Sequence, residues 1–83
     1  MKIVKITSTW CPSCIIMNNV FNKINKKYPD LEVITYDYDF DEEMVSKYNV
    51  GEILPVLIFM EDDKEIGRLI GEKSFDEVEK FLK

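Results

Sequence analysis

Histidine is absent from this 83-residue sequence, and other residues with special chemistry or backbone geometry are scarce. The chain has two cysteines, one tryptophan, three glycines and three prolines. Without histidine, no cysteine nucleophile can be paired with an imidazole base, and no zinc site can use a histidine ligand. Activation of a cysteine would have to come from backbone dipoles and lysine side chains.

Long apolar segments and basic clusters are also lacking. The longest apolar run, 53–60, contains Pro55 and is too short to span a bilayer, and the N-terminal residues lack an apolar stretch of signal-peptide length. We therefore expect a cytoplasmic protein without membrane contact. The 16 acidic and 11 basic residues give a net charge of −5, which disfavours nucleic acid as a partner.

The periodicity of the apolar residues predicts alternating strands and helices in a single domain over residues 1–83. Strands are predicted at 2–7, 31–36, 55–60 and 65–70, and helices at 12–28, after the acidic segment 37–43 and after Ser74. The order βαβαββα predicts an α/β fold, with a four-stranded mixed sheet of order 2-1-3-4 and helices on both faces. We expect the domain to be a monomer.

Side-chain spacing also predicts which side of a helix is buried and where a helix begins. Residues at helical spacing define the buried side of the first helix: Ile16, Met17, Val20, Phe21, Ile24 and Tyr28. Capping-box spacing predicts that Asp39 starts the second helix and that Ser74 starts the third. We interpret the acidic run around Asp39 as a solvated helix start.

The two cysteines, Cys11 and Cys14, enclose Pro12 and Ser13 and follow Trp10. A Cys-x-x-Cys between a strand and a helix is typical of redox-active dithiols. Proline is favoured at the first helical position, so Cys11 is the predicted N-cap. Its sulfur then faces the N–H groups of Ser13 and Cys14 at the positive end of the helix dipole. Cys11 is therefore the predicted nucleophile, more acidic than free cysteine with its pKa of about 8.5.

Cys14 lies three residues after Cys11, on the same helical face and deeper in the helix. It is predicted to remain a thiol until Cys11 is captured in a mixed disulfide, and then to resolve that intermediate. The pair would be its own redox centre, so no cofactor or metal is expected. Since the chain has no glycine-rich dinucleotide fingerprint, electrons would have to come from another protein or a small thiol.

Three features together resemble the thioredoxin superfamily: the motif from Trp10 to Cys14, the Leu54-Pro55 step before an apolar strand, and Gly71 after the hairpin. The resemblance covers essentially the whole chain, in a glutaredoxin-sized form without the family's N-terminal strand and helix. It implies a thiol–disulfide oxidoreductase that acts on disulfide-containing proteins, with a separate reductase or glutathione as electron donor.

The same resemblance assigns roles to individual residues. It implies that Pro55 is a cis-proline beside the cysteines and that the backbone of Leu54 pairs with a bound substrate chain. Trp10, Pro12 and Ser13 would complete the substrate-binding surface. Trp10 could instead simply cap the core, but tryptophan often has one wet edge, so a flat surface for substrate beside Cys11 stays an equal alternative.

Two positions depart from the family pattern. Lys5 stands where thioredoxins have a buried, proton-shuttling aspartate, so that role does not carry over. The Lys5 ammonium either reaches solvent or lies under the motif and favours thiolates. Ser13 stands where thioredoxins have proline and keeps an N–H for the Cys11 sulfur, which predicts a more oxidising disulfide than Cys-Gly-Pro-Cys would give.

Two other functions compete with this interpretation. A glutathione-dependent, glutaredoxin-like enzyme would need a basic pocket, for which the candidates are Lys47, Lys73 and Arg68, and this motif lacks the tyrosine of glutaredoxins. A non-catalytic zinc-binding or adaptor module would need more ligands than Cys11 and Cys14 supply, which only a dimer would provide.

Overall fold

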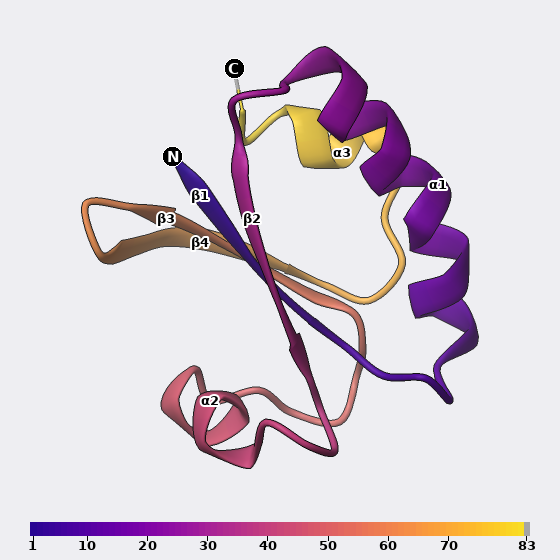
Figure 1. Cartoon of the computed structure of the whole chain (residues 1–83), viewed down its shortest axis with the longest axis vertical. Helices are drawn as coiled ribbons and strands as arrows, with labels where there is room; N and C mark the ends of the chain where they lie inside the picture. Colours follow the sequence, from indigo (N-terminus) through magenta and orange to yellow (C-terminus); the bar gives the residue numbers. More distant parts are fainter. Residues whose placement is uncertain (83) are drawn as a thin grey trace.

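The computed structural model describes residues 1–82, and the elements within them follow the predicted order. These elements are β1 (Lys2–Thr7), α1 (Pro12–Lys27), β2 (Glu32–Asp37), α2 (Glu42–Lys47), β3 (Val56–Glu61), β4 (Lys64–Ile70) and α3 (Phe75–Glu79). The sheet order is β2-β1-β3-β4, with β2 parallel to β1 and the other neighbours antiparallel. This confirms the predicted α/β fold and sheet order (Figure 1). No helix in these 82 residues is long and apolar enough to cross a membrane.

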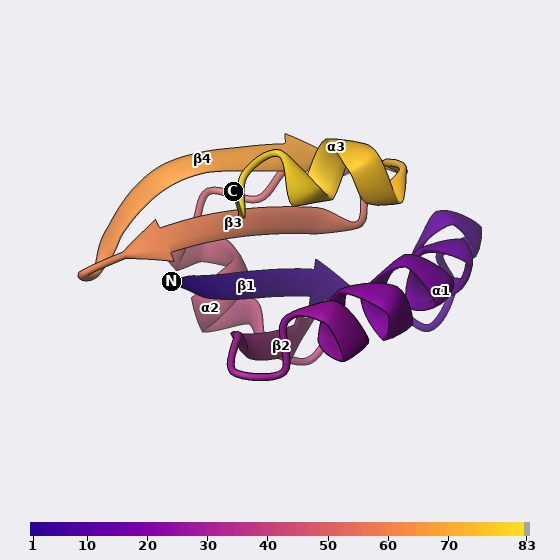
Figure 2. The ribbon, with the colours of Figure 1, turned by 90° about the horizontal axis from the view of Figure 1, so that it is seen from above.

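Helices cover both faces of the sheet, α1 and α3 on one face and α2 on the other (Figure 2). Successive side chains of a strand point to opposite faces, so Ile3 packs towards α1 while Val4 and Ile6 pack towards α2. The central strand β3 is buried from Val56 to Met60, as expected for a strand covered on both sides. The apolar core is therefore two layers with the sheet between them.

The layer on the α2 side contains both cysteines. Its buried members are Val4, Ile6, Cys11, Cys14, Leu54, Val56, Ile58 and Met60. The layer under α1 and α3 consists of Ile3, Met17, Phe21, Ile24, Leu57, Phe59 and Val78. The start of α1 thus belongs to one layer and the rest of that helix to the other.

In the second layer, Gly67 of β4 lies directly beneath the ring of Phe81. That ring stacks on Phe59, with centroids 4.4 Å apart and planes 9° apart. A Cβ at residue 67 would collide with the Phe81 ring. The glycine therefore allows the C-terminal segment to lie flat against the sheet.

The buried carboxylate of Glu79 links α3 to the C-terminal end of α1. It forms an ion pair with Lys27 and accepts a hydrogen bond from the Tyr28 hydroxyl at 3.1 Å. The hydrogen bond to Glu79 raises the pKa of the Lys27 amine. Sequence periodicity identified the apolar residues of this last helix but not its buried glutamate.

Two local predictions are wrong. Ile16 is 52% exposed, because it lies about 100° around α1 from the row of buried side chains. The helix α2 follows the N-cap Asp41 and does not begin at Asp39. Here the Asp37 carboxylate accepts hydrogen bonds from the N–H groups of Asp39 and Phe40, and the Asp41 carboxylate accepts one from Asp37. These side chains hold a turn where the helix start was expected.

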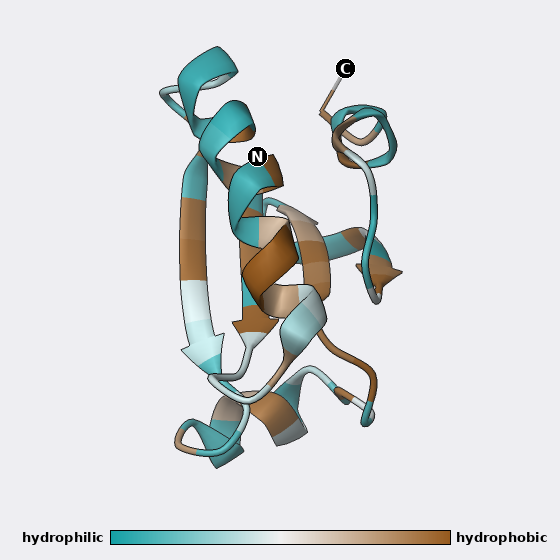
Figure 3. Cartoon of the chain, turned by 90° about the vertical axis from the view of Figure 1, so that its right-hand side faces the viewer, coloured by the Kyte–Doolittle hydropathy of each residue, from teal (hydrophilic) through white to brown (hydrophobic). Residues whose placement is uncertain are grey.

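The exposure of Ile16 and its neighbour Ile15 leaves the beginning of α1 apolar on its outer side. In Figure 3 the N-terminal half of this helix carries brown segments, whereas its C-terminal half is mostly teal. Ile15 is 61% exposed. The hydrophilic end of α1 therefore lies far from the cysteines and the apolar end lies beside them.

Candidate redox site

The Cys11 side chain caps the N-terminus of α1, as the position of Pro12 predicted. Cys11 has extended backbone angles, φ −93° and ψ 112°, and its sulfur accepts a hydrogen bond from the Cys14 N–H at 3.3 Å. Of the two donors expected for this sulfur, Ser13 and Cys14, the structure shows the bond from Cys14. Donors of this kind stabilise negative charge on sulfur more than they stabilise a neutral thiol.

The second thiol, Cys14, lies in a different electrostatic environment. Burial and the contact with Cys11 together raise the pKa of its thiol to about 11, against the opposing effect of a backbone hydrogen bond with Ser8 and of the charge of Lys5. Both cysteines are free thiols and each is 5% exposed. Cys14 is therefore protonated at neutral pH, as the sequence predicted for the resolving thiol.

The peptide bond between Leu54 and Pro55 is cis, which confirms the expectation drawn from the family resemblance. It brings the Leu54 carbonyl oxygen within 3.6 Å of the Cys11 sulfur, whose thiol donates to it. Gly71 supports the far side of this loop by donating its N–H to the Pro55 carbonyl oxygen at 2.8 Å. Gly71 has φ +88°, a left-handed conformation that suits glycine.

Trp10 is fixed at the edge of the site by a residue from another element. Its indole N–H donates to Asp39 at 2.7 Å, and the same carboxylate oxygen accepts a hydrogen bond from the Ser8 hydroxyl at 3.3 Å. The indole also meets the ring of Tyr38 edge-on, with centroids 6.3 Å apart. Trp10 is 57% exposed, so its ring does not cap the core. The ring is fixed in place by these contacts and open to solvent.

Ser8 and Asp39 are the functional-site residues that sequence reasoning missed. They are 31 positions apart in the sequence, and nothing in their spacing indicates that they meet. They meet because β1 and β2 are parallel neighbours, so the segments that follow the two strands leave the sheet at the same edge. One carboxylate of the acidic run, that of Asp39, thus belongs to the site because it holds the Trp10 indole.

Lys5 points into the space beneath the motif. Its amine lies 4.2 Å from the centroid of the Phe21 ring, and Lys5 and Cys14 line the same small cavity. Burial lowers the pKa of the Lys5 amine, while the nearby Cys14 opposes that shift. Of the two placements that the sequence left open, the structure favours the one under the motif.

Of the three basic residues considered for a glutathione pocket, Lys73 donates its backbone N–H to the Met17 sulfur at 3.3 Å, and the side chains of the other two have contacts elsewhere. The Arg68 guanidinium is paired with Glu65 through two contacts of 2.6 Å. Lys47 lies over the ring of Tyr48, at the end of α2. Within residues 1–82 there is no cluster of three or more cysteine, aspartate or glutamate side chains arranged to hold a metal ion.

The sheet order, the dithiol at a helix start and the adjacent cis-proline define an α/β protein of the thioredoxin-like fold. The family model described as Thioredoxin matches residues 1–83. The chain is 34% identical over 79 residues to a thioredoxin H5 of Oryza sativa subsp. japonica, which covers 95% of this chain and 58% of that relative. It is 32% identical over 73 residues to an H-type thioredoxin of Picea mariana, covering 88% and 58%.

Solved structures agree with these sequence matches. The crystal structure of thioredoxin NaTrxh from Nicotiana alata superposes with a TM-score of 0.89 at 30% identity, over 98% of this chain and 69% of that one. The chain belongs to the thioredoxin family. It spans about 58% of the length of the first two curated relatives.

Proposed function

We propose that this chain is a thiol–disulfide oxidoreductase in which Cys11 attacks and Cys14 resolves. The observation that carries the proposal is the inequality of the two sulfurs. The Cys11 sulfur accepts the Cys14 N–H at the start of α1, whereas the pKa of Cys14 is raised to about 11. Exchange between a dithiol and a disulfide needs two adjacent sulfurs that differ in this way.

The reaction proceeds in two exchanges. The Cys11 thiolate attacks one sulfur of a substrate disulfide, forms a mixed disulfide and expels the other substrate sulfur as a thiolate, which takes a proton from solvent. Cys14 then loses its proton and attacks the Cys11 sulfur. The product is a Cys11–Cys14 disulfide, and the second substrate sulfur leaves as a thiolate that is also protonated. The cysteine pair gives two electrons to the substrate, and the substrate takes up two protons, one matched by the proton that Cys14 releases and one supplied by solvent.

The substrate lies, in this proposal, across the surface formed by Trp10, Pro12, Ser13, Leu54 and Pro55. Support comes from the exposure of the Trp10 ring and from the Leu54 carbonyl oxygen, which lies 3.6 Å from the attacking sulfur. An extended substrate segment that pairs with the Leu54 backbone would have its disulfide next to Cys11. Ile53, 64% exposed beside this loop, extends the apolar part of the surface.

We further propose that the protein works as a cytoplasmic monomer and receives electrons from a separate protein reductase. The pairing of Arg68 with Glu65 leaves that guanidinium neutralised, which argues against its use for a glutathione carboxylate. The dithiol would need no cofactor beyond itself. The expected protein substrates are those with accessible disulfides.

Insulin reduction with dithiothreitol as reductant tests the proposal. The wild-type chain should accelerate precipitation of the insulin B chain, and Cys11→Ser should abolish the acceleration. Cys14→Ser should accumulate a covalent Cys11–substrate adduct, visible by mass spectrometry under non-reducing conditions. Equal alkylation rates of the two thiols at pH 7, together with no insulin reduction, would overturn the assignment.

The same assay separates the competing functions. With NADPH and a thioredoxin reductase as electron source, turnover is expected. Turnover with glutathione and glutathione reductase alone would instead support the glutaredoxin-like function. Zinc that remains bound after purification, with no disulfide reduction, would support a metal-binding or adaptor module.

A further inference from the structure

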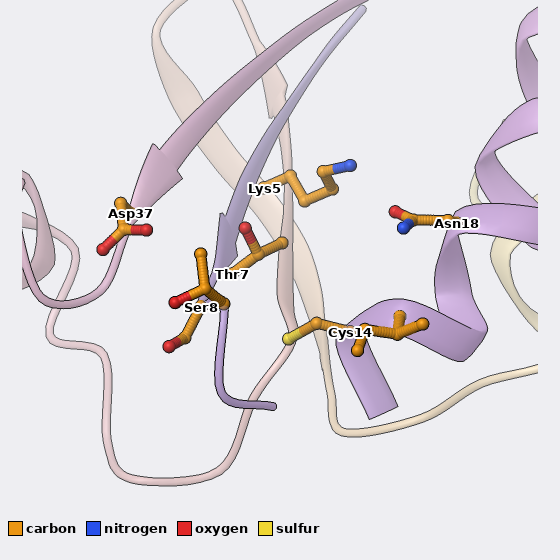
Figure 4. Close-up of a pocket in the computed structure, with 8 residues that line it drawn as sticks. Lys5, Thr7, Ser8, Cys14, Asn18 and Asp37 are labelled. Atoms are coloured by element: carbon orange, nitrogen blue, oxygen red, sulfur yellow. The ribbon is translucent and has the colours of Figure 1, made fainter. Parts of the chain in front are cut away.

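Behind the motif lies a small polar cavity that contains Cys14 but not Cys11. It has a volume of about 230 Å³ and lies between the ends of β1 and β2 and the first turns of α1. Its polar or charged lining includes Lys5, Thr7, Ser8, Asn18 and Asp37 (Figure 4). Cys14 therefore meets Cys11 on one side and a space lined by polar groups on the other.

Lys5 reaches this cavity from the middle of a buried strand. Its neighbours Val4 and Ile6 are buried on the opposite face, and its paired residue on β3 is the buried Leu57. The amine lies 4.2 Å from the Phe21 ring centroid, a contact that attracts a cation and fixes its place under α1. The charge is thus held at the cavity by packing.

Few other charges act on Cys14 from this side. Asp37, at the end of β2, also lines the cavity, but one of its oxygens accepts the N–H groups of Asp39 and Phe40 in the turn before α2. The α1 residue Asn18 is neutral. Lys5 is therefore the cation of this cavity within residues 1–82.

We propose that Lys5 is a positioning residue for the second exchange, its ammonium stabilising the Cys14 thiolate that attacks the mixed disulfide on Cys11. This rests on the proposed oxidoreductase function and deepens it. In the step, the proton of Cys14 leaves to solvent through the polar cavity, the Cys14–Cys11 bond forms, and the bond from Cys11 to the substrate breaks. The substrate sulfur leaves with the electron pair and takes up a proton, so no further oxidant or reductant is needed.

The electrostatic contact between the two groups is reciprocal. The charge of Lys5 lowers the pKa of Cys14 against its burial, and Cys14 raises the pKa of Lys5 against the burial of the amine. Removing the Lys5 ammonium would therefore raise the pKa of Cys14, because the effect of burial would no longer be opposed by this charge. Because Cys14 is protonated at neutral pH, its rate of attack follows its thiolate fraction.

Reaction of the reduced protein with 5,5′-dithiobis-(2-nitrobenzoate) separates the two exchanges. Attack by Cys11 releases one thionitrobenzoate, and the following attack by Cys14 releases the second. Stopped-flow absorbance should show the second phase slowed about threefold at pH 7 in Lys5→Met, the effect of about half a pKa unit, with the first phase changed much less. In the same variant the pH midpoint of the second phase should move upward.

Matched variants distinguish charge from packing. Lys5→Arg keeps the charge and should restore most of the rate, whereas Lys5→Gln should behave like Lys5→Met. Lys2→Met, on the same strand but outside the cavity, should match wild type. A second measure is the pKa of Cys14 itself, obtained in a Cys11→Ser background from the pH dependence of the thiolate absorbance. This pKa should rise when Lys5→Met is added.

A second phase of wild-type rate and pH midpoint in Lys5→Met, or a Cys14 titration unmoved by that change, would overturn the role of Lys5. The proposed function would survive that result, because both releases would still occur. If instead the wild-type protein releases no thionitrobenzoate by a second exchange, the oxidoreductase assignment itself fails.

Discussion

The indole N–H of Trp10 donates to the carboxylate of Asp39 across 2.7 Å, so the residue beside Cys11 is held by the segment that precedes α2. Asp39 also accepts the Ser8 hydroxyl, and Ser8 accepts the backbone N–H of Trp10 at 3.3 Å. Three hydrogen bonds among Ser8, Trp10 and Asp39 thus hold the exposed ring between the segments that follow β1 and β2.

Loss of the contact between Trp10 and Asp39 should weaken substrate binding and have little effect on the reactivity of Cys11. In Asp39→Ala the indole loses its acceptor, and we expect KM for insulin to rise about threefold to tenfold, since a hydrogen bond to a charged group contributes roughly 1.5–3 kcal/mol before its exposure is discounted. The alkylation rate of Cys11 should stay within about twofold. Steady-state kinetics and iodoacetamide labelling measure the two quantities.

Controls for the Asp39 variant come from the same acidic run. Asp39→Asn keeps an acceptor oxygen and should recover most of the affinity. Glu43→Gln removes one negative charge from the exposed start of α2 and should leave KM unchanged. A KM that rises in both Asp39→Asn and Glu43→Gln as much as in Asp39→Ala would show that net charge matters and the hydrogen bond does not.

The close approach at Gly67 predicts a loss of stability on substitution. Gly67→Ala places a Cβ against the Phe81 ring, and overpacking of this kind typically costs about 1–3 kcal/mol. Urea unfolding followed by circular dichroism measures the change. Gly51→Ala is the matched control, because a Cβ there meets nothing within 4 Å. Equal stability of the two variants would contradict the proposed fit of Phe81.

Loss of the hydrogen bond from Tyr28 to Glu79 should change the free energy of unfolding and leave the redox site unaffected. Tyr28→Phe removes the hydroxyl that donates to this buried carboxylate and should cost about 1 kcal/mol, the usual net value of such a bond. Cys11 reactivity should not change, because the contact lies at the other end of α1. An unchanged urea midpoint would show that solvent or another donor replaces the hydroxyl.

Titration of Lys5 and Cys14 should affect the stability of the reduced protein in opposite directions. From pH 9 to about 11 the folded chain retains the Cys14 proton that the unfolded chain has lost, so stability falls as pH rises. Because the pKa of Lys5 is lowered, its ammonium opposes folding at neutral pH, and that penalty disappears as pH rises through its lowered value towards 10.5.

The pH prediction is tested by removing one group at a time. Lys5→Met should raise the urea midpoint of the reduced protein at pH 7. Lys5→Met combined with Cys14→Ser should lack the fall between pH 9 and 11 that Lys5→Met alone shows. Parallel stability profiles of the single and double variants across this range would contradict a raised pKa of Cys14.

Local patterns in the sequence were sufficient for the strands, the first helix and the cysteine cap. Pro12 at the first helical position places Cys11 at the N-cap, and the β-branched runs give the strands with boundaries shifted by about one residue. These features depend on neighbours in the chain, which a sequence displays directly. The cis bond before Pro55 came from family resemblance, since few X-Pro bonds are cis in general.

The features that the sequence did not reveal depend on contacts between distant segments. Asp39 has the spacing of a helix cap, but the Asp37 and Asp41 side chains build a turn and leave Asp39 to bind Trp10. From the sequence alone, Glu79 would be taken for a solvent-exposed glutamate. Its hydrogen bond with Tyr28 exists only because α3 packs against the end of α1. Spacing identifies candidate acceptors, and only the fold determines which donor reaches them.

The sheet divides the apolar interior so that the thiols share a compartment with α2, while the aromatic stack of Phe59 and Phe81 lies in the other. We therefore expect substitutions in the aromatic compartment to alter heat tolerance and to leave the proposed electron transfer by the dithiol unchanged. Evolution or an engineer could adjust these two traits one at a time, and they meet at Lys5, whose amine lies over the Phe21 ring and which lines the same cavity as Cys14.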